Sequence, residues 1–505
     1  MSLSKYCKIT AILLIALIVL LALWLIKKPL YEPEEKIIAC IKDRTISLDE
    51  LIRRAEYMVR PNYCKGNTNI HKKIILNSLI AEKLLAIEGE NRCELLNNPH
   101  FQRYIQGRKE QAMRQVLYSE VAYKKVKLDT SEINKMYKLA GRKYTIEYVS
   151  IMDDSLSKVI IGKFSADGRN FREVFQDLPQ PITIFEQELL FDHRQHPVIF
   201  KELYKQNVNV NQILGPIKNE DDGSNIFIKI IGWKNRPAIG EQDSKRRLMD
   251  VHERLTEIEA LDIYAKYVHK VMKNKTVTFN RDVYEQLVNI LGPYYFERND
   301  DPKDRLFKTS GDDVVENPLD SLSVDLKMII DEPLLTIDSE TWTVRDLSEE
   351  IEIHPLVYRV RKMHPQEFGK YFRLAVVDLI RDKYLAKEAY KKGYDKVDIV
   401  RRNVEMWRDS HVAIATVGGY LKQNSITEKD PLKLVSEYLN PLVDSLQKKY
   451  SDQIKINTKD YYDINLTRID MVATQTNVPF PVAVPLFPIL TDDHNLDYGK
   501  VMDLQ

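Results

Sequence analysis

The chain has 505 residues, 44% of them hydrophobic and 30% charged, so it can bury about three domain cores. Its 75 basic and 74 acidic residues leave a formal net charge of +1, which argues against binding nucleic acid through bulk charge. It has only 17 glycines and contains neither a GxGxxG nor a GxxxxGK[ST] segment, so a glycine-cradled phosphate site is not expected.

The N-terminal region predicts a membrane anchor. Residues 9–26 read ITAILLIALIVLLALWLI, without a charge, and as a helix they would span about 27 Å, close to the thickness of a bilayer core. Trp24 stands where an interfacial aromatic residue is common. No small-x-small cleavage site closes the run, which favours an uncleaved signal-anchor after a cytoplasmic N-terminus, residues 1–8, over a cleaved signal peptide. Basic residues flank both ends, so charge alone does not set the orientation.

The cysteines and histidines do not predict a metal site. Cys40, Cys64 and Cys93 follow the predicted anchor without a CxxC pair or a zinc-like spacing. The three cysteines could form one disulfide and leave one free thiol, or all three could be buried thiols. His193 and His196 stand three residues apart, but Pro197 follows at once, so a surface turn is favoured over a metal site. We therefore predict neither a metal nor a cofactor.

Residues 33–143 have the pattern of a mainly helical module. Ile37–Ile41 predicts a short strand, and Ser47 with Glu50 three residues later is the signal of a capped helix start. Further helices are predicted over residues 69–88, from Pro99 to about Tyr123, and after a cap at Asp129 or Thr130.

Residues 144–237 interrupt this helical pattern. Tyr144–Ile151 alternates as a strand does, and Asn225–Ile231 predicts another strand after a turn at Leu214–Lys218. We interpret the stretch as a small α/β domain inserted into the helical module. The module then resumes over residues 238–280, with a long amphipathic helix and a strand at Val277–Phe279. Residues 281–332 contain a polar, Asp-rich stretch and are predicted as a linker.

The second half of the chain repeats the first. Ile41–Leu51 aligns without a gap with Ile337–Leu347, and the ten residues from Leu79 share six identities with the ten from Leu379. The closing strand of the first copy also resembles Ile454–Ile456. We therefore predict a second module over residues 333–457, and we expect the end strands of each module to pair with one another.

The last segment, residues 458–505, contains the apolar, proline-rich run Val478–Ile489. Proline removes backbone donors and favours extended chain. We predict a strap that packs along the second module. The alternative is that the run occupies a peptide groove as a built-in ligand.

Four local motifs carry a family resemblance. They are Leu128–Tyr137, Gly168–Phe171, His196–Phe200 and Leu214–Lys218. In this order they resemble the lead-in helix, the G-x-x-F and P-x-F segments and the G-P-V turn of the parvulin-type foldases, the SurA, PpiD and PrsA group. The resemblance covers roughly residues 5–280. It implies a transmembrane helix, a SurA-like helical chaperone module and a parvulin-like domain inserted in it. Together with the internal repeat, it predicts a mainly helical α+β protein with two similar SurA-like modules.

The resemblance also implies a proline-binding pocket. Its candidate lining residues are Tyr148, Phe191, Phe200, Ile226 and Phe227. Active parvulins usually carry one histidine on the first strand and another on the last, and Tyr148 and Ile226 occupy those positions here. The family's G-G-x-L-G segment is absent as well. Isomerisation must cross a barrier of about 18–20 kcal/mol, so the loss of these groups predicts weak or no isomerase activity.

The resulting functional prediction is a chaperone that holds unfolded or nascent extracytoplasmic polypeptides without ATP. Membrane attachment would be through one helix in the bacterial inner membrane, with the bulk of the chain periplasmic. An active prolyl isomerase and a structural protein of a cell-envelope assembly are the alternatives. No nucleic-acid partner is predicted, and self-association is left open.

Overall fold

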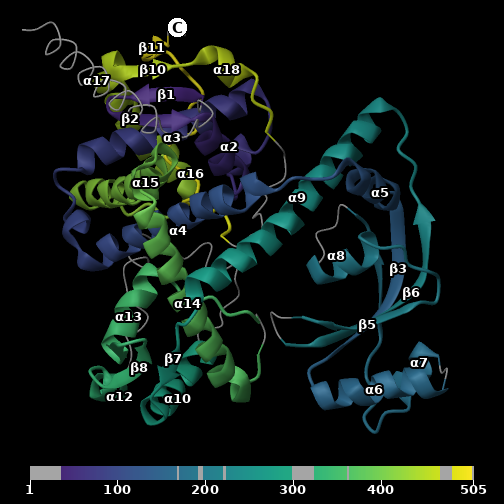
Figure 1. Cartoon of the computed structure of the whole chain (residues 1–505). Helices are drawn as coiled ribbons and strands as arrows, with labels where there is room; N and C mark the ends of the chain where they lie inside the picture. Colours follow the sequence, from purple (N-terminus) through teal and green to yellow (C-terminus); the bar gives the residue numbers. More distant parts are fainter. Residues whose placement is uncertain are drawn as a thin grey trace, which may run out of the picture. The chain divides into compact units, whose positions relative to one another are not determined.

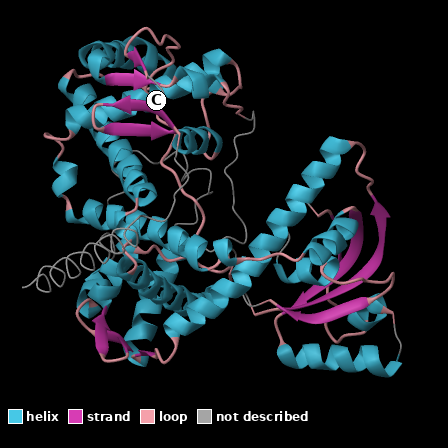
Figure 2. Cartoon of the chain, turned by 45° about the horizontal axis from the view of Figure 1, so that its top comes forward, coloured by secondary structure: helices cyan, strands magenta, loops and turns pink. Residues whose placement is uncertain are grey.

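The computed structural model describes residues 36–167, 170–191, 197–219, 223–297, 324–360, 363–466 and 480–502. It is mainly helical with three separate sheets, an α+β protein as predicted (Figures 1 and 2). None of the helices in these ranges has the length and apolar character needed to cross a bilayer. The predicted anchor at residues 9–26, the histidine pair His193 and His196, and residues 298–323 of the predicted linker lie outside them.

The chain divides into two compact units. Among the described residues, the first unit contains 36–88, 421–466 and 484–502. The second contains the described residues from 89 to 420 and residues 480–483. Each unit therefore combines segments from both halves of the sequence.

The first unit has a four-stranded sheet in the order β11-β10-β1-β2. The strands are β1 (Ile37–Ile41), β2 (Arg44–Ser47), β10 (Ile454–Ile456) and β11 (Lys500–Val501). The helices are α2 (Leu48–Glu56), α3 (Asn69–Gly89), α16 (Pro431–Lys433), α17 (Asn440–Tyr450) and α18 (Thr458–Tyr462), with a π-helical stretch at Leu434–Leu439. Residues on several sides of α3, such as Leu76, Leu79 and Ile80, are fully buried, so α3 is a central helix of this unit.

The second unit contains a helical part and an α/β part. The helical part has α4 (Pro99–Val121), α9 (Glu241–Met272), α10 (Arg281–Glu297), α12 (Val324–Ile329), α13 (Val344–Ile353), α14 (Phe368–Lys391) and α15 (Asp398–Gln423), with the sheet β7 (Val277–Phe279), β8 (Pro333–Ile337) and β9 (Glu340–Thr343). Helix α4 packs against α13 and α14. Gly107 of α4 permits this approach, because an added Cβ would lie 2.1 Å from the carbonyl oxygen of Ile353.

The α/β part is built on an antiparallel sheet in the order β4-β3-β6-β5. Its strands are β3 (Arg142–Ile151), β4 (Phe185–Leu189), β5 (Ile213–Lys218) and β6 (Asn225–Asn235), and its helices are α5 (Thr130–Ala140), α6 (Asp154–Asp167), α7 (Phe171–Gln176) and α8 (Pro197–Tyr204). Helices α6 and α7 cover one face, while α5, α8 and part of α9 cover the other (Figure 1). The strands predicted near Tyr144 and Asn225 are thus present.

Gly215 is required by the bend in β5. Its φ is +126°, and a Cβ there would lie 2.6 Å from the carbonyl oxygen of Ile226. A turn was predicted at Leu214–Lys218, but these residues belong to strand β5, and the bend at Gly215 is a shift in the register of β5 against β6.

The predicted internal repeat is visible in the backbone. Strands β8 and β9 correspond residue for residue to β1 and β2 at the offset of the sequence alignment. The turns between them place Lys42 and Asp338 at the same φ of +54°. The helices that follow are capped by Ser47 and Thr343, which also occupy equivalent positions. The N-cap predicted at Ser47 is confirmed, because its side chain accepts a hydrogen bond from the backbone N–H of Glu50.

The expected pairing of the end strands was wrong. The closing strand of the second copy, β10, pairs with β1 of the first copy, and β7 of the first copy pairs with β8 of the second. Each of these two sheets therefore joins the opening hairpin of one copy to the closing strand of the other. The physical reason is that the copies present equivalent strand edges, so the local pattern of either copy is compatible with both pairings.

The cysteines Cys40, Cys64 and Cys93 are free thiols, of which Cys64 is buried. Of the predicted C-terminal segment, residues 458–466 with helix α18 and residues 484–502 belong to the first unit, and residues 480–483 to the second. In the first unit, Ser78 and Asn77 of α3 donate hydrogen bonds to backbone carbonyls of Thr491 and Asp493. Residues 484–502 are extended, and among them only Lys500–Val501 form a strand, β11.

Candidate peptide-binding site

The sheet of the α/β part places the five predicted pocket residues on two faces. Tyr148 on β3 and Ile226 on β6 belong to the same face, as their register shows. Phe191, which follows β4, and Phe200 of α8 pack on that face too. Phe227 points to the opposite face and packs with α6 and α7. Four of the five residues are thus brought together, and one is not.

The four residues on the shared face belong to a hydrophobic core, and they do not together line an open pocket. Phe200 is fully buried, and Phe191 and Ile226 are each 7% exposed. The rings of Phe191 and Phe200 lie 5.3 Å apart in an edge-to-face arrangement, which stabilises by about 0.5–1.5 kcal/mol beyond burial. Among the five predicted residues, half-buried Tyr148 retains surface that a peptide could contact.

A small cavity reaches Phe191 where β6 leads into α9. Its volume is about 130 Å³, below the roughly 300 Å³ typical of ligand pockets. The other walls include Arg236, Arg247 and Asp250, so the cavity is mainly polar. This chemistry does not match the apolar surface that a proline ring requires.

The accessible aromatic surface lies instead at strand β4, which sequence reasoning missed. Phe185 at the start of β4 is 52% exposed and stands directly opposite Tyr148 in the sheet. Their rings stack with centroids 5.6 Å apart. The sequence Phe185-Glu186-Gln187-Glu188-Leu189 has apolar residues only at its two ends, so it lacks the apolar face by which a strand is recognised.

β4 is an edge strand of its sheet. In the described part of the chain it pairs only with β3, so its outer backbone donors and acceptors have no strand partner. Four of its five residues are exposed. An extended peptide can add to such an edge through main-chain hydrogen bonds, while alternate side chains determine specificity.

The two faces of this edge differ in chemistry. Phe185 and Gln187 lie on the face of Tyr148, whereas Glu186 and Glu188 lie on the other face. Lys143 approaches Glu188 at 2.6 Å, and its hydrogen bond holds the pKa of that carboxyl below the ordinary value. Glu186 is more than half exposed and its carboxylate is 3.8 Å from the nearest guanidinium nitrogen of Arg172.

Arg172 is fixed mainly by a buried partner. Its guanidinium binds the Glu147 carboxylate on β3, and this hydrogen bond raises the pKa of Arg172. Lys229 on β6 lies 3.8 Å from the second oxygen of Glu147. The two β4 carboxylates are more than half exposed beside Lys143 and Arg172, and they favour a strand with basic residues at alternate positions.

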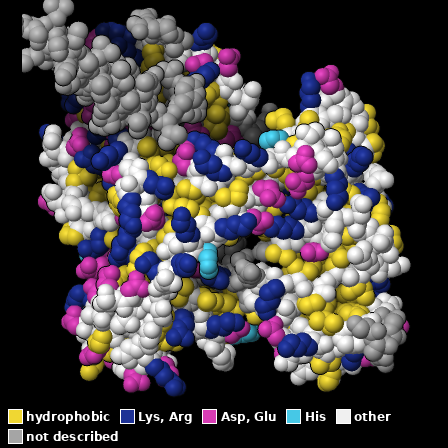
Figure 3. All heavy atoms as spheres, in the orientation of Figure 1, with side chains coloured by type: hydrophobic (Ala, Val, Ile, Leu, Met, Phe, Trp, Pro, Cys, Tyr) yellow, Lys and Arg dark blue, Asp and Glu magenta, His cyan; other side chains and the backbone are white. Residues whose placement is uncertain are grey.

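Comparison with protein-family models and with curated protein sequences found no match to this chain. Within the described ranges, no three histidine, cysteine or acidic side chains gather as a metal site would require. Acidic and basic side chains are interspersed over the molecular face in Figure 3, in line with the net charge of +1.

Proposed function

We propose that the protein is an extracytoplasmic, membrane-anchored chaperone related to the parvulin-type foldases, and that it holds extended polypeptides on the outer edge of β4. The observation that carries the proposal is this exposed edge with the stacked pair Tyr148 and Phe185 at one end. Such a site binds by backbone hydrogen bonds and an aromatic contact, and it needs no reactive group.

Three features support the family part of the proposal. The motifs of residues 128–218 follow the order of the family, and the segment Leu214–Lys218 forms a strand that pairs with the long last strand β6. The helical elements around the α/β part are present in two equivalent copies. The apolar run at residues 9–26 is the segment that we propose as the membrane anchor.

We expect the protein to leave the rate of proline isomerisation near its uncatalysed value. Ile226 cannot donate a hydrogen bond to a substrate amide, and the phenylalanines of the predicted pocket are buried. A protease-coupled assay with proline peptides measures this. A clear acceleration by the full-length chain, lost in Tyr148→Phe, would establish the isomerase alternative instead.

The β4 site is tested with a fluorescein-labelled peptide KFKVKFKV, which alternates apolar and basic residues. Its control, KKFFKKVV, has the same composition without the alternation. We expect Phe185→Ala to weaken binding of the first peptide about tenfold, which is about 1.4 kcal/mol. Val210→Ala is the matched variant, because Val210 is equally exposed at 52% but lies outside β4.

Two results would count against the proposal. The first is equal binding of both peptides, or equal effects of the two substitutions, since the edge of β4 would then not select the peptide. The second is a failure of the full-length chain to suppress light scattering by chemically unfolded citrate synthase at equimolar concentration. The first result would refute the β4 site, and the second would refute the chaperone function.

A further inference from the structure

The C-terminal segment docks on the second unit through one aromatic side chain. Phe480 is 6% exposed and packs in a cluster with apolar residues of α4, α9 and α14. The ring of Tyr264 meets it edge-on at 6.1 Å, and the guanidinium of Arg114 lies 5.0 Å from its centroid. The ring is therefore held by an apolar surface and by a cation–π contact.

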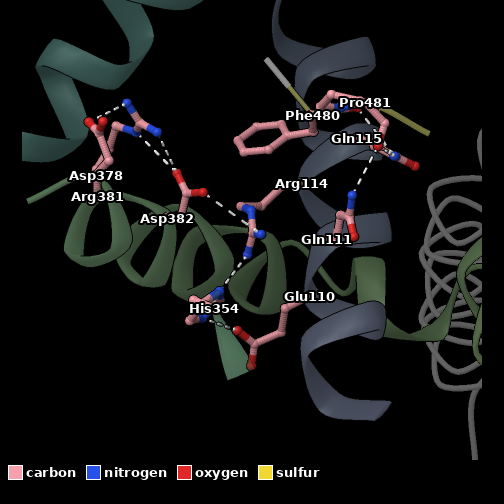
Figure 4. Close-up of polar contacts among 10 residues, drawn as sticks. All are labelled: Glu110, Gln111, Arg114, Gln115, His354, Asp378, Arg381, Asp382, Phe480 and Pro481. Carbon is pink, nitrogen blue, oxygen red and sulfur yellow. Dashed lines mark hydrogen bonds and ion pairs between the residues drawn. The ribbon is translucent and has the colours of Figure 1, made fainter. Parts of the chain in front are cut away.

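The backbone beside this ring is recognised by two glutamines (Figure 4). Gln111 and Gln115 are four residues apart, on one side of α4. The side-chain amide of Gln111 donates to the carbonyl of Pro481 at 2.9 Å. That of Gln115 lies within 3.2 Å of the carbonyl of Phe480 and 3.0 Å of that of Pro481. The site therefore contacts an aromatic ring and two successive backbone carbonyls.

Arg114 is oriented by a buried network beneath the ring (Figure 4). Its guanidinium donates to Nδ1 of His354 at 3.1 Å, so the ring proton of neutral His354 is on Nε2 and points to Glu110 at 2.9 Å. Burial raises the pKa of the Glu110 carboxyl, but its hydrogen bonds to His354 and Gln106 outweigh burial and leave the pKa below the ordinary value. This chain of hydrogen bonds from Arg114 through His354 to Glu110 fixes the surface on which Phe480 lies.

We propose that this surface, the Phe480 site (Gln111, Arg114, Gln115 and Tyr264), is a second peptide-binding site, specific for extended segments in which an aromatic residue precedes proline. The chain's own Phe480-Pro481 occupies it as a built-in competitor. Every contact described above is made to features that any such segment carries, namely a ring, two successive backbone carbonyls and a proline nitrogen, which has no N–H and so needs no acceptor.

A second Phe-Pro pair of the same run is bound in the first unit. Phe487, which precedes Pro488, is 5% exposed there, and Arg54 donates to the carbonyl of Leu486 just before it at 2.8 Å. Each unit thus holds one aromatic–proline pair of this chain with a cationic donor nearby. The Phe480 site does not depend on the β4 site, and the two can be tested separately.

The test uses fluorescein-labelled VPFPVA, which is the chain's own sequence over residues 478–483, and VPAPVA as its control. Wild-type protein should bind VPFPVA weakly, because a tethered competitor acts at an effective concentration of about millimolar. Phe480→Ala should bind it at least about tenfold more tightly. Adding Gln111→Ala and Gln115→Ala should abolish this gain, and binding of KFKVKFKV should stay unchanged throughout.

Unchanged VPFPVA binding by folded Phe480→Ala would overturn the proposal and leave the contact a purely structural one. If that variant does not fold, wild-type protein is treated with excess VPFPVA carrying benzoylphenylalanine in place of phenylalanine. Photocrosslinks to α4 that unlabelled VPFPVA suppresses and VPAPVA does not would support the site. Their absence, or crosslinks elsewhere, would refute it.

Discussion

The crosswise strand pairing makes a direct prediction about Cys40. In the first unit, Cys40 of β1 stands opposite Lys455 of β10. Hydrogen bonds from Lys42 to Gln453 and from Asn457 to Ile38 flank this pair, so it is also a hydrogen-bonded pair, with Cα atoms about 5.5 Å apart. That spacing suits a disulfide. We expect Lys455→Cys to form one with Cys40 on mild oxidation.

The size of the stabilisation follows from the loop that this bond closes. Residues 40 and 455 enclose about 415 residues, and the chain-entropy relation then gives about 6 kcal/mol at 25 °C, while measured disulfides contribute about 2–4 kcal/mol. We expect the oxidised variant to gain at least about 2 kcal/mol in the free energy of unfolding of the first unit. Urea titration, with and without a reductant, measures the gain.

The matched control comes from the equivalent strand of the other copy. Thr278→Cys alone should form no bond with Cys40, because β7 pairs with β8. The double variant Thr278→Cys/Thr336→Cys should crosslink, since these residues are register partners. Peptide mapping by mass spectrometry identifies each bond. A bond between Cys40 and residue 278 would refute the crosswise pairing and restore the arrangement in which each copy closes on itself.

Three further changes test the packing. Arg54→Met should lower the free energy of unfolding of the first unit by about 3–5 kcal/mol in urea titration. The substitution leaves the carboxylate of Glu82 buried without its bidentate partner, so adding Glu82→Leu should recover much of the loss. Gly215→Ala should destabilise the α/β part by about 2 kcal/mol or more in thermal unfolding. Gly162→Ala should stabilise α6 by about 0.5–1 kcal/mol, because a Cβ added at residue 162 meets open space. Equal effects of the two substitutions would contradict the close contact at residue 215. Burial raises the pKa values of Tyr104, Tyr118 and Tyr284 to about 12, so their contribution to stability is complete below pH 10 and is lost as the pH rises from 10 to 12. Tyrosinate absorbance at 295 nm should therefore rise together with the loss of helical circular dichroism, and ionisation near pH 10 in a folded chain would speak against this burial.

Local features of the sequence were sufficient for most of the elements. The capping signal at Ser47, the helical spacing over residues 69–88 and the alternation at Tyr144–Ile151 all correspond to elements of the structure. These features depend on side-chain periodicity and on hydrogen bonds within a few residues, and both can be read along the chain. The internal repeat was visible for the same reason.

The candidate sites could be read only in part. Phe191 and Phe200 are on one face as expected, but sequence does not distinguish a phenylalanine that lines a pocket from one that fills a core. β4 was missed because its charged, exposed residues lack the apolar face of a typical strand. The Phe480 site combines residues of α4 and α9 with a segment more than 200 residues beyond α9, and no local pattern links them.

The sequence by itself therefore determined most of the segments that become strands and helices, though not β4 or the strand at Ile213–Lys218, and it showed that the two halves of the chain are similar to one another. Only the tertiary structure decided which copy completes which sheet. β7 and β10 have similar sequences and offer the same backbone groups, so β1 and β8 can each accept either strand, and the difference in free energy comes from the side chains packed around each sheet and from the connections between them.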